Sequence, residues 1–399
     1  MIPRLTLDLS WFDLMRGFQY CLGKSRPRYA ELEQLWCEEG AVVHLSVRSL
    51  WDAYLSTRSW PKGSEVLMSA VTIPHMAEIV RAAGYVPVPI DLDLSTMEPS
   101  VELVKQRISE KTRAMIVAHL FGGFVDLTPF SLVCQEEAID LIEDCAQAYN
   151  GTQFRGDLRA TMSLFSFGTI KSATALGGGI ATIRDPALRR VIQAKRDEAP
   201  YLQQHKYLFK ILKYALIKRI STPRIFGSLF WLCDRLGIDF DGVLNASVRG
   251  FSGGQLFEKL RTQPPQAMLR LLQRRILQDR SKFYAERGVA ARALFSSLPA
   301  QVTPLGIQSL QYTGWIIPVI AEQREELTAY LRAHGYDATY RASSMYAISA
   351  PEGFPDPNNA QTAFEEVLYL PIYPHLGVVG YQRLAQIICQ FYQTRSENG

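Results

Sequence analysis

The chain has 399 residues, of which 47% are hydrophobic and 21% are charged. These values are typical of a globular protein of about two domains, and they exclude a largely disordered chain. The net charge of +4 is too small to indicate nucleic-acid binding, and no recognition motif accompanies it.

Short β-rich segments alternate with helical patterns from Ala41 to about Arg196. The predicted strands are 41–46, 65–70, 86–91, 114–120, 138–144, 163–167 and 178–183. Apolar strands that alternate with helices indicate a mainly parallel sheet with helices on both faces. We therefore predict an α/β fold with a seven-stranded sheet in a large domain.

The pattern changes after Arg196. A helical, basic stretch at 201–237 is followed by a glycine-rich linker (245–254). After the linker we predict helices at about 266–294 and 323–334, a strand near 315–320 and a last helix after Gly380. We therefore divide the chain into an N-terminal segment (1–40), a large domain (41–250) with a basic helical insertion (about 201–237), and a smaller C-terminal α/β domain (251–399).

Two interpretations of the basic stretch 201–237 are open. It carries seven Lys or Arg against one acid, which is typical of an amphipathic helix on an anionic membrane surface. The candidate inserted residues are Phe209, Leu212, Leu216, Phe226, Phe230 and Trp231. Alternatively, the apolar face packs on the large domain or across a dimer interface, and the bundling of the apolar residues favours this interpretation.

Cysteine and histidine are scattered, which argues against a disulfide framework and against a metal site. The six cysteines include no CxxC pair, and the six histidines show no HExxH spacing. The first residues, MIPRLTLDLSWFDLMRGF, lack the apolar core and cleavage site of a signal peptide. No segment of ~18 uncharged apolar residues is present, so we expect no membrane-spanning helix and a cytoplasmic protein.

Three features fall at predicted strand ends, where open parallel sheets bind their ligands. Asp144 ends one strand, Lys171 follows the strand that ends near Ser166, and the turn 46–49 leads into a helix expected to begin near Leu50. A helix start offers N–H groups and a positive dipole to an anion. A lysine, a carboxylate and a phosphate cradle are the parts of a pyridoxal 5'-phosphate (PLP) site.

Two motifs carry a family resemblance. IEDCAQAYNG (142–151) and FSFGTIKSATALGGG (165–179) resemble blocks of the DegT/StrS-type sugar aminotransferases, a fold-type-I PLP family. The stretches 80–127 and 370–376 extend the resemblance over most of the chain from about Ala41. It implies a transaminase that moves an amino group from an amino acid, glutamate being the expected donor, to a keto-sugar or related ketone. It also implies a homodimer with shared active sites.

The resemblance assigns roles position by position. Lys171 matches the Schiff-base lysine, and Asp144 matches the residue that keeps the pyridine nitrogen protonated. Gln147 matches the residue beside the ring. The implied phosphate contacts are Ser166, Arg48, Ser49 and Val47, with Arg249 as the residue that reaches the neighbouring subunit's site.

The sequence departs from the family in several motifs. The phosphate turn reads SVRSL (46–50) rather than SGTAA, and the family's GEGG reads LGGG (176–179). No Phe or Trp stands in TIPHM (72–76), so His75 is the nearest ring that could cover the cofactor. Arg341 is a candidate partner for a substrate carboxylate. These departures mark a divergent branch and leave the usual nucleotide-sugar substrate open.

Two other functions remain open at this point. The same lysine and aspartate could serve a PLP-dependent decarboxylase, lyase or dehydratase, because substrate contacts decide which bond breaks. A membrane-surface binding module that has kept the fold without turnover is the alternative from another class. The presence of both Lys171 and Asp144 argues against such a module, which has no need of a Schiff-base lysine.

Overall fold

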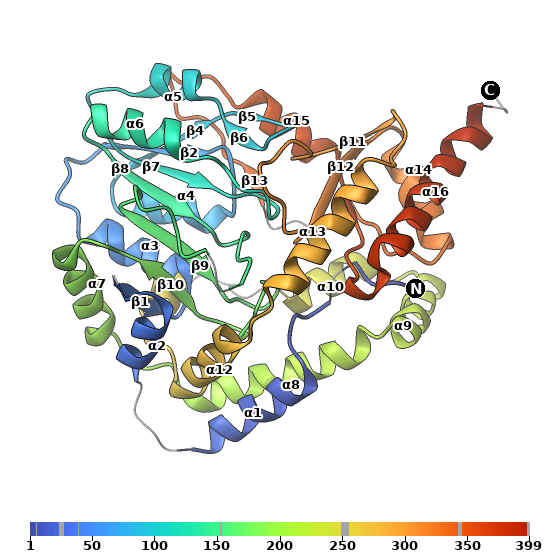
Figure 1. Cartoon of the computed structure of the whole chain (residues 1–399), viewed down its shortest axis with the longest axis horizontal. Coiled ribbons are helices and arrows are strands. Elements are labelled where there is room, and N and C mark those ends of the chain that lie inside the picture. Colours follow the sequence, from blue (N-terminus) through green and yellow to red (C-terminus); the bar gives the residue numbers. More distant parts are fainter. Residues whose placement is uncertain are drawn as a thin grey trace.

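A seven-stranded sheet organises the first half of the chain (Figure 1). The computed structural model describes residues 1–4, 6–23, 28–38, 40–151, 154–248, 255–341 and 345–396. The strand order is β1-β10-β9-β8-β7-β2-β4. The strands are β1 (Ala41–His44), β2 (Glu65–Ser69), β4 (Val86–Ile90), β7 (Thr112–Ala118), β8 (Asp140–Asp144), β9 (Met162–Ser166) and β10 (Gly179–Thr182).

The predicted fold class is confirmed. β4, β2, β7, β8 and β9 run parallel to their neighbours in that order, and β10 is antiparallel to both β9 and β1. Each predicted strand forms within one or two residues of its expected position, because the buried apolar runs leave little freedom in register.

Helices cover both faces of this sheet. Alternate residues of β2 enter different cores: Val66 and Met68 point to one face, and Leu67 points to the other. The first face is covered by α3 (Val47–Ser56), α4 (Pro74–Ala82) and α7 (Pro186–Glu198). The second is covered by α5 (Val101–Arg107) and α6 (Thr128–Glu136) and, beside β1 and β10, by α1 (Trp11–Leu22), α2 (Tyr29–Trp36), α8 (Gln204–Ile220) and α12 (Gln266–Leu277).

Helix α3 begins three residues earlier than predicted, directly against β10. Ser46 caps it by accepting a hydrogen bond from the Ser49 N–H at 3.2 Å. A Cβ atom on Gly179 would lie 2.5 Å from the carbonyl carbon of Ser46 and 2.5 Å from the nitrogen of Val47. Only glycine at position 179 therefore allows the helix to start at this point.

A three-stranded sheet forms the core of the C-terminal part. β11 (Val302–Pro304), β12 (Ile317–Ala321) and β14 (Val367–Leu370) pack against α13 (Ser281–Phe295), α14 (Arg324–Ala333) and α16 (Gly377–Ser396). The smaller elements are β3 (Val71–Thr72), β5 (Leu92–Asp93), β6 (Glu98–Pro99), β13 (Tyr346–Ala347), α9 (Pro223–Arg235), α10 (Phe240–Val248), α11 (Leu256–Leu260), α15 (Asn358–Glu366) and a 3-10 turn (Pro374–Leu376).

Two local predictions are wrong. The helix expected over 266–294 is interrupted between α12 and α13, because Gln278 is extended and the side chain of Asp279 accepts the N–H of Ser281 at the start of α13. Residues 245–248, expected to belong to a linker, are instead the last residues of α10. The division into domains is not decided by these elements and stays a prediction.

The basic stretch 201–237 forms α8 and α9 along the lower edge of the molecule in Figure 1. On α8, Tyr207, Ile211 and Tyr214 are buried in the core shared with α1 and α12. On α9, Phe226 is buried with Cys233 and Phe240, so the expectation that Phe226 inserts into a membrane is wrong.

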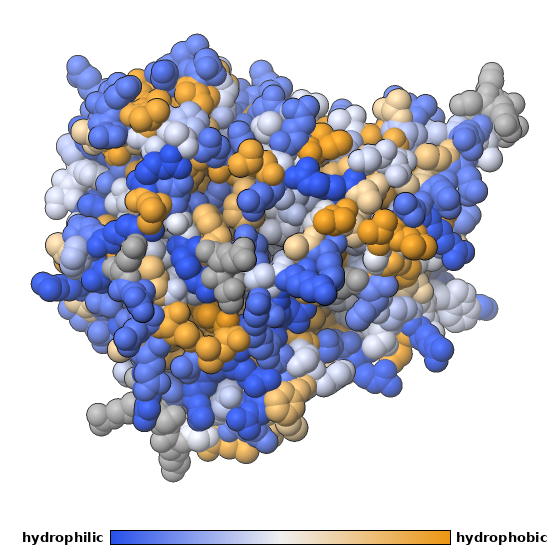
Figure 2. Space-filling view, in the orientation of Figure 1, coloured by the Kyte–Doolittle hydropathy of each residue, from blue (hydrophilic) through white to orange (hydrophobic). Residues whose placement is uncertain are grey.

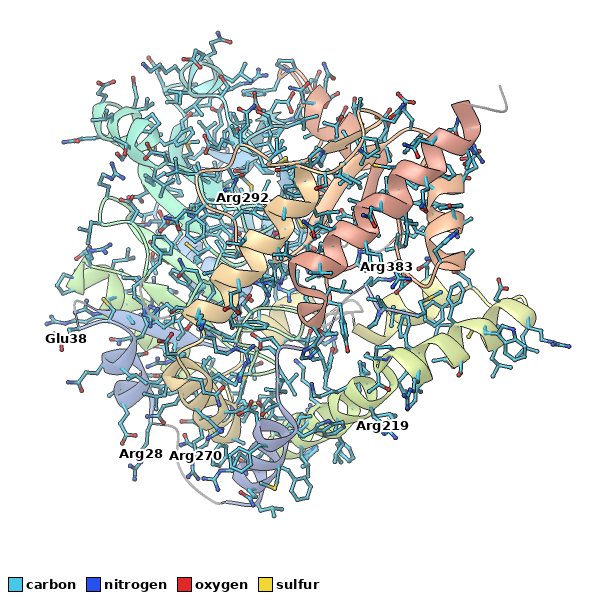
Figure 3. All side chains as sticks on the ribbon, turned by 45° about the vertical axis from the view of Figure 1, so that its right-hand side comes forward. Arg28, Glu38, Arg219, Arg270, Arg292 and Arg383 are labelled. Carbon is cyan, nitrogen blue, oxygen red and sulfur yellow. The ribbon has the colours of Figure 1, made fainter. Side chains whose placement is uncertain are left out.

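The outer side of these helices is mixed in character. Phe209, Leu212, Leu216 and Trp231 are exposed. Apolar and hydrophilic side chains alternate along this edge in Figure 2, and Figure 3 shows Arg219 of α8 at the surface. Among the described residues, no helix is both long and apolar enough to cross a membrane.

Replacement of Gly179 by alanine should lower the free energy of unfolding by about 1–3 kcal/mol, because the added methyl overlaps the backbone at the start of α3. Gly23→Ala is the matched control, since its added methyl lies 3.6 Å from its nearest neighbour. Urea denaturation followed by circular dichroism measures both variants. Equal free energies of unfolding for the two variants would contradict the close approach of Gly179 to the start of α3.

Candidate active site

The ends of three strands meet at one edge of the large sheet. Gly179, the first residue of β10, lies opposite Ser166 at the end of β9 and opposite His44 at the end of β1. Asp144, at the end of β8, pairs with Leu164. Because β8 and β9 are parallel, their carboxyl ends share this edge, which is where open α/β sheets bind ligands.

Lys171 lies in the loop between β9 and β10, and the N-terminal segment holds that loop. The carboxylate of Asp8 accepts a hydrogen bond from the N–H of Ala173 at 2.7 Å and another from the hydroxyl of Tyr284 at 2.6 Å. Although burial acts to raise it, the Arg275 and Arg280 guanidinium groups hold the pKa of Asp8 below its usual value. Asp8 is therefore an ionised anchor for the lysine loop.

The same loop is held from two other directions. The indole N–H of Trp315 donates to the carbonyl of Ile170 at 2.9 Å, and the hydroxyl of Tyr207 on α8 donates to the carbonyl of Ala175 at 2.6 Å. The Lys171 Nζ lies 4.0 Å from the centre of the Trp315 ring, which is a cation–π distance. The position of the amine is thus set by residues far from it in sequence.

The amine of Lys171 and the carboxylate of Asp144 are electrostatically coupled. Burial lowers the pKa of Lys171 to about 7; Asp144 opposes this shift and Arg48 adds to it. Burial raises the pKa of Asp144, while the Ala146 N–H, which donates to it at 2.9 Å, and Lys171 act in the other direction. A large share of the Lys171 amine is therefore neutral near pH 7, the form that attacks a carbonyl.

Cationic and hydroxyl groups gather at the start of α3. The hydroxyls of Ser46 and Ser49 lie 3.0 Å apart, and Val47 occupies the first helical position. The guanidinium of Arg48 donates to Nδ1 of His75 at 2.8 Å, which joins the first turns of α3 and α4. Burial lowers the pKa of Arg48 to about 10. The pKa of His75 is also lowered, mainly by burial and further by the charge of Arg48, so this imidazole is neutral.

Gln147 and Ser166 have partners within the chain. The side-chain oxygen of Gln147 accepts the N–H of Phe121 at 2.8 Å, and its amide nitrogen lies 3.4 Å from the sulfur of Met345. The hydroxyl of Ser166 accepts the N–H of Gly168 at 3.4 Å. Both hydrogen bonds attach these side chains to turns next to the strand ends.

One predicted residue lies away from this cluster, and another falls outside the described part of the chain. Arg341 is exposed, lies against the ring of Tyr340, and lines a surface cavity of about 230 Å³ together with Phe230 and Asp241. Its substrate role stays a prediction. Arg249 lies outside the described residues.

A buried group beside the cluster has a structural explanation. Ligand atoms of His119, Glu143 and Cys145 lie within 4.8 Å of one another. Nδ1 of His119 accepts the N–H of Val125 at 2.9 Å, so Nε2 carries the proton that is donated to Glu143 at 2.8 Å. This hydrogen-bonded pair satisfies both polar side chains and gives His119 a structural role.

Trp315 and Lys210 lie outside the motifs that predicted the site. Lys210 is half-buried on α8, and its ammonium group is coupled electrostatically to Arg48. The helical spacing of Tyr207, Lys210 and Tyr214 could have placed Lys210 on an inward face. Nothing near Trp315 in the sequence indicates its contact with Lys171.

The residues present fit PLP. An amine with a lowered pKa, a carboxylate at a strand end and a cationic helix start offer the three contacts that its aldehyde, pyridine nitrogen and phosphate require. The fit to PLP rests on the chemistry of these three groups and on their position at the same edge of the sheet.

Comparison with known proteins agrees with this chemistry. Residues 51–211 match the DegT/DnrJ/EryC1/StrS aminotransferase family. The family resemblance is confirmed over this segment. An L-glutamine:2-deoxy-scyllo-inosose aminotransferase of Streptomyces kanamyceticus is 35% identical over 148 residues, which cover 35% of this chain. The aligned part spans 34% of that relative, about a third of its length.

Solved aminotransferase structures show the same fold over nearly the whole chain. The aminotransferase TlmJ of Streptoalloteichus hindustanus has a TM-score of 0.72 at 17% identity and covers 99% of this chain and 100% of its own. NtdA of Bacillus subtilis, solved with pyridoxamine phosphate (PMP), has a TM-score of 0.66 at 14% identity. The match covers 96% of this chain and 82% of NtdA. The chain therefore has the fold-type-I architecture of these aminotransferases.

Covalent labelling of Lys171 should increase as the pH rises through about 7. Below that pH the amine is protonated and unreactive, and above it the neutral amine predominates. An unperturbed lysine in a peptide titrates near ~10.4. Brief acetylation of the PLP-free protein over a series of pH values, with quantification by mass spectrometry, gives the midpoint. A midpoint near that of a peptide lysine would contradict the burial of this amine.

Proposed function

We propose that this protein is a PLP-dependent aminotransferase. The proposal is carried by the Lys171 amine, whose pKa is about 7, held at one edge of the sheet together with Asp144. A structural lysine gains nothing from such burial, which acts against its charged form. The family match over residues 51–211 supports the same chemistry.

The chain's own residues have distinct tasks in this reaction. PLP, when bound, supplies an electron sink for the substrate. Lys171 Nζ would hold the cofactor aldehyde and, when free, would take up and return the proton of the substrate's α-carbon. The Asp144 carboxylate would accept a hydrogen bond from the protonated pyridine nitrogen, and a positive charge there would favour ionised Asp144 against the effect of burial. The indole of Trp315 covers one side of the amine.

The donor and acceptor belong to the proposal. We propose an amino acid donor, glutamate or glutamine, and a polar cyclic ketone such as a keto-sugar or keto-inositol as acceptor. The relative from Streptomyces kanamyceticus is named for glutamine and 2-deoxy-scyllo-inosose, and a solved neighbour from Helicobacter pylori is described as acting in pseudoaminic acid biosynthesis. A homodimer with shared active sites remains part of the proposal.

A spectroscopic assay tests the activity. PLP added to the protein should give a visible absorbance band that glutamate or glutamine abolishes, with release of the 2-oxo acid. Lys171→Ala should lower the rate by about 10²–10⁴-fold because the proton-transfer group is lost. Lys282→Ala, which removes an exposed lysine on α13, is the control and should match the unaltered protein.

Two results would contradict the aminotransferase. One is the absence of any visible band with PLP. The other is release of carbon dioxide or of an eliminated group without formation of the aminated cofactor, which would instead favour the decarboxylase or lyase. Asp144→Asn separates the roles: we expect it to keep the visible band and to lose most of the transamination rate.

A further inference from the structure

Helix α1, at the lower edge of the molecule in Figure 1, leaves a stripe of large apolar side chains uncovered. Trp11, Met15, Phe18 and Leu22 are between 39% and 68% exposed. These residues follow one another at intervals of three or four, so they share one side of the helix. Leu14, on another side, is buried in the core that α1 shares with α8 and α12. The stripe is therefore the outer side of a helix that is otherwise packed.

Helix α8 carries a second stripe of the same kind. Phe209, Leu212 and Leu216 are between 48% and 66% exposed and are spaced by three and four residues. The other side of α8 is buried and covers the loop between β9 and β10, where the hydroxyl of Tyr207 donates to the carbonyl of Ala175 at 2.6 Å. One side of α8 thus packs on the large domain, and the other side is left exposed.

The two helices lie side by side, so the two stripes belong to one surface. The side chain of Gln204, at the start of α8, donates to the carbonyls of Cys21 and Gly23 at the end of α1, at 2.7 and 2.9 Å. Further along, a Cβ atom on Gly17 would lie 3.1 Å from Cδ1 of Ile211. The helices α1 and α8 therefore run antiparallel in close contact. We call their two exposed apolar stripes together the α1–α8 surface.

The exposed charged groups of these two helices are cations. Helix α8 contains five Lys or Arg residues and no acid, and Lys206, Lys213 and Arg219 are exposed (Figure 3 shows Arg219). The acid of α1, Asp13, is buried and paired with Arg275 at 2.9 Å. The α1–α8 surface therefore combines apolar side chains with a positive charge that no exposed acid of the two helices offsets.

This combination of apolar and basic groups favours one kind of partner. Neighbouring exposed apolar residues with a polar rim mark a site of interaction rather than ordinary surface. A second copy of the chain fits this site poorly, because a two-fold contact places the same patch on both sides and so sets cations against cations. A bilayer with anionic headgroups fits both features, because Trp, Phe and Leu enter the headgroup region while Lys and Arg are attracted to its negative charge.

We propose that the α1–α8 surface docks this protein on an anionic lipid bilayer. The two helices lie in the plane of the membrane, with Trp11, Phe18 and Phe209 among the headgroups and with Lys206 and Lys213 beside the lipid phosphates. Because an α-helix is about 10–12 Å thick, docking brings the lysine loop under α8 within about one helix diameter of the membrane. Docking needs no cofactor, so it is independent of the proposed function.

Flotation of the full chain with lipid vesicles over a series of lipid concentrations tests this surface. The protein should float with vesicles of phosphatidylglycerol and phosphatidylcholine in equal parts, and should stay at the bottom with phosphatidylcholine alone. Leu212→Ser should weaken binding to the mixed vesicles by about 10-fold, because this side chain no longer gains by leaving water. Leu132→Ser, which changes a similarly exposed leucine on α6, is the matched control and should bind as the unaltered protein does.

A charge variant gives a second readout. Lys206→Gln combined with Lys213→Gln should lower the affinity for the mixed vesicles by about 10- to 30-fold, since each cation near an anionic bilayer contributes about a factor of five. The difference should shrink as added salt screens the charges. Lys105→Gln combined with Lys282→Gln removes two exposed lysines from α5 and α13 and should leave vesicle binding unchanged.

Four results would overturn the membrane docking. They are the absence of flotation with the mixed vesicles, equal flotation with phosphatidylcholine alone, equal affinities of Leu212→Ser and Leu132→Ser, and a change from dimer to monomer in Leu212→Ser measured by light scattering. The last result would assign the α1–α8 surface to a second copy of the chain. Flotation of the PLP-free protein with the expected loss in Leu212→Ser would support docking even if PLP gave no visible band.

Discussion

The burial of the Lys171 amine is the constraint on which the other features of the candidate site depend. Burial lowers its pKa to about 7, so the chain holds a neutral amine next to the carboxylate of Asp144. A loop that carries such a group has no tendency to bury it by itself, because a solvated ammonium is more stable. The loop must therefore be held by its surroundings, and Asp8, Tyr207 and Trp315 hold it from three separate parts of the chain.

The sheet and the start of α3 supply the second half of the arrangement. The strand ends bring Asp144 and Ser166 to one edge, and Gly179 allows the first turn of α3 to approach that edge. Arg48 then stands close enough to Lys171 to lower its pKa further. A cofactor with an aldehyde, a protonated ring nitrogen and a phosphate would satisfy each of these groups, which is why the geometry favours PLP over a neutral ligand.

The sequence was sufficient for the sheet, because buried strands are local signals. Short motifs were enough to single out Lys171 and Asp144 as candidates, and their roles stay predictions. The sequence was insufficient for Trp315, Asp8 and Lys210. Each reaches the lysine loop through tertiary packing, and no local pattern encodes that contact. The apolar residues of the basic stretch show the same limit: periodicity predicted a helix, but only packing decides that Tyr207 is buried and Phe209 exposed. The start of α3 predicted near Leu50 is late because the Ser46 side chain caps the helix, which therefore begins at Val47.

Chemical trapping of the cofactor tests the central claim most directly. Borohydride reduction of the complex with PLP fixes the pyridoxyl group on the lysine that binds it, and peptide mapping by mass spectrometry identifies that lysine. The account predicts the label on Lys171 and not on Lys210, although burial lowers the pKa of both amines, because only Lys171 has Asp144 among the groups that act most strongly on it. A label on Lys210, on any other lysine, or on none would contradict the account.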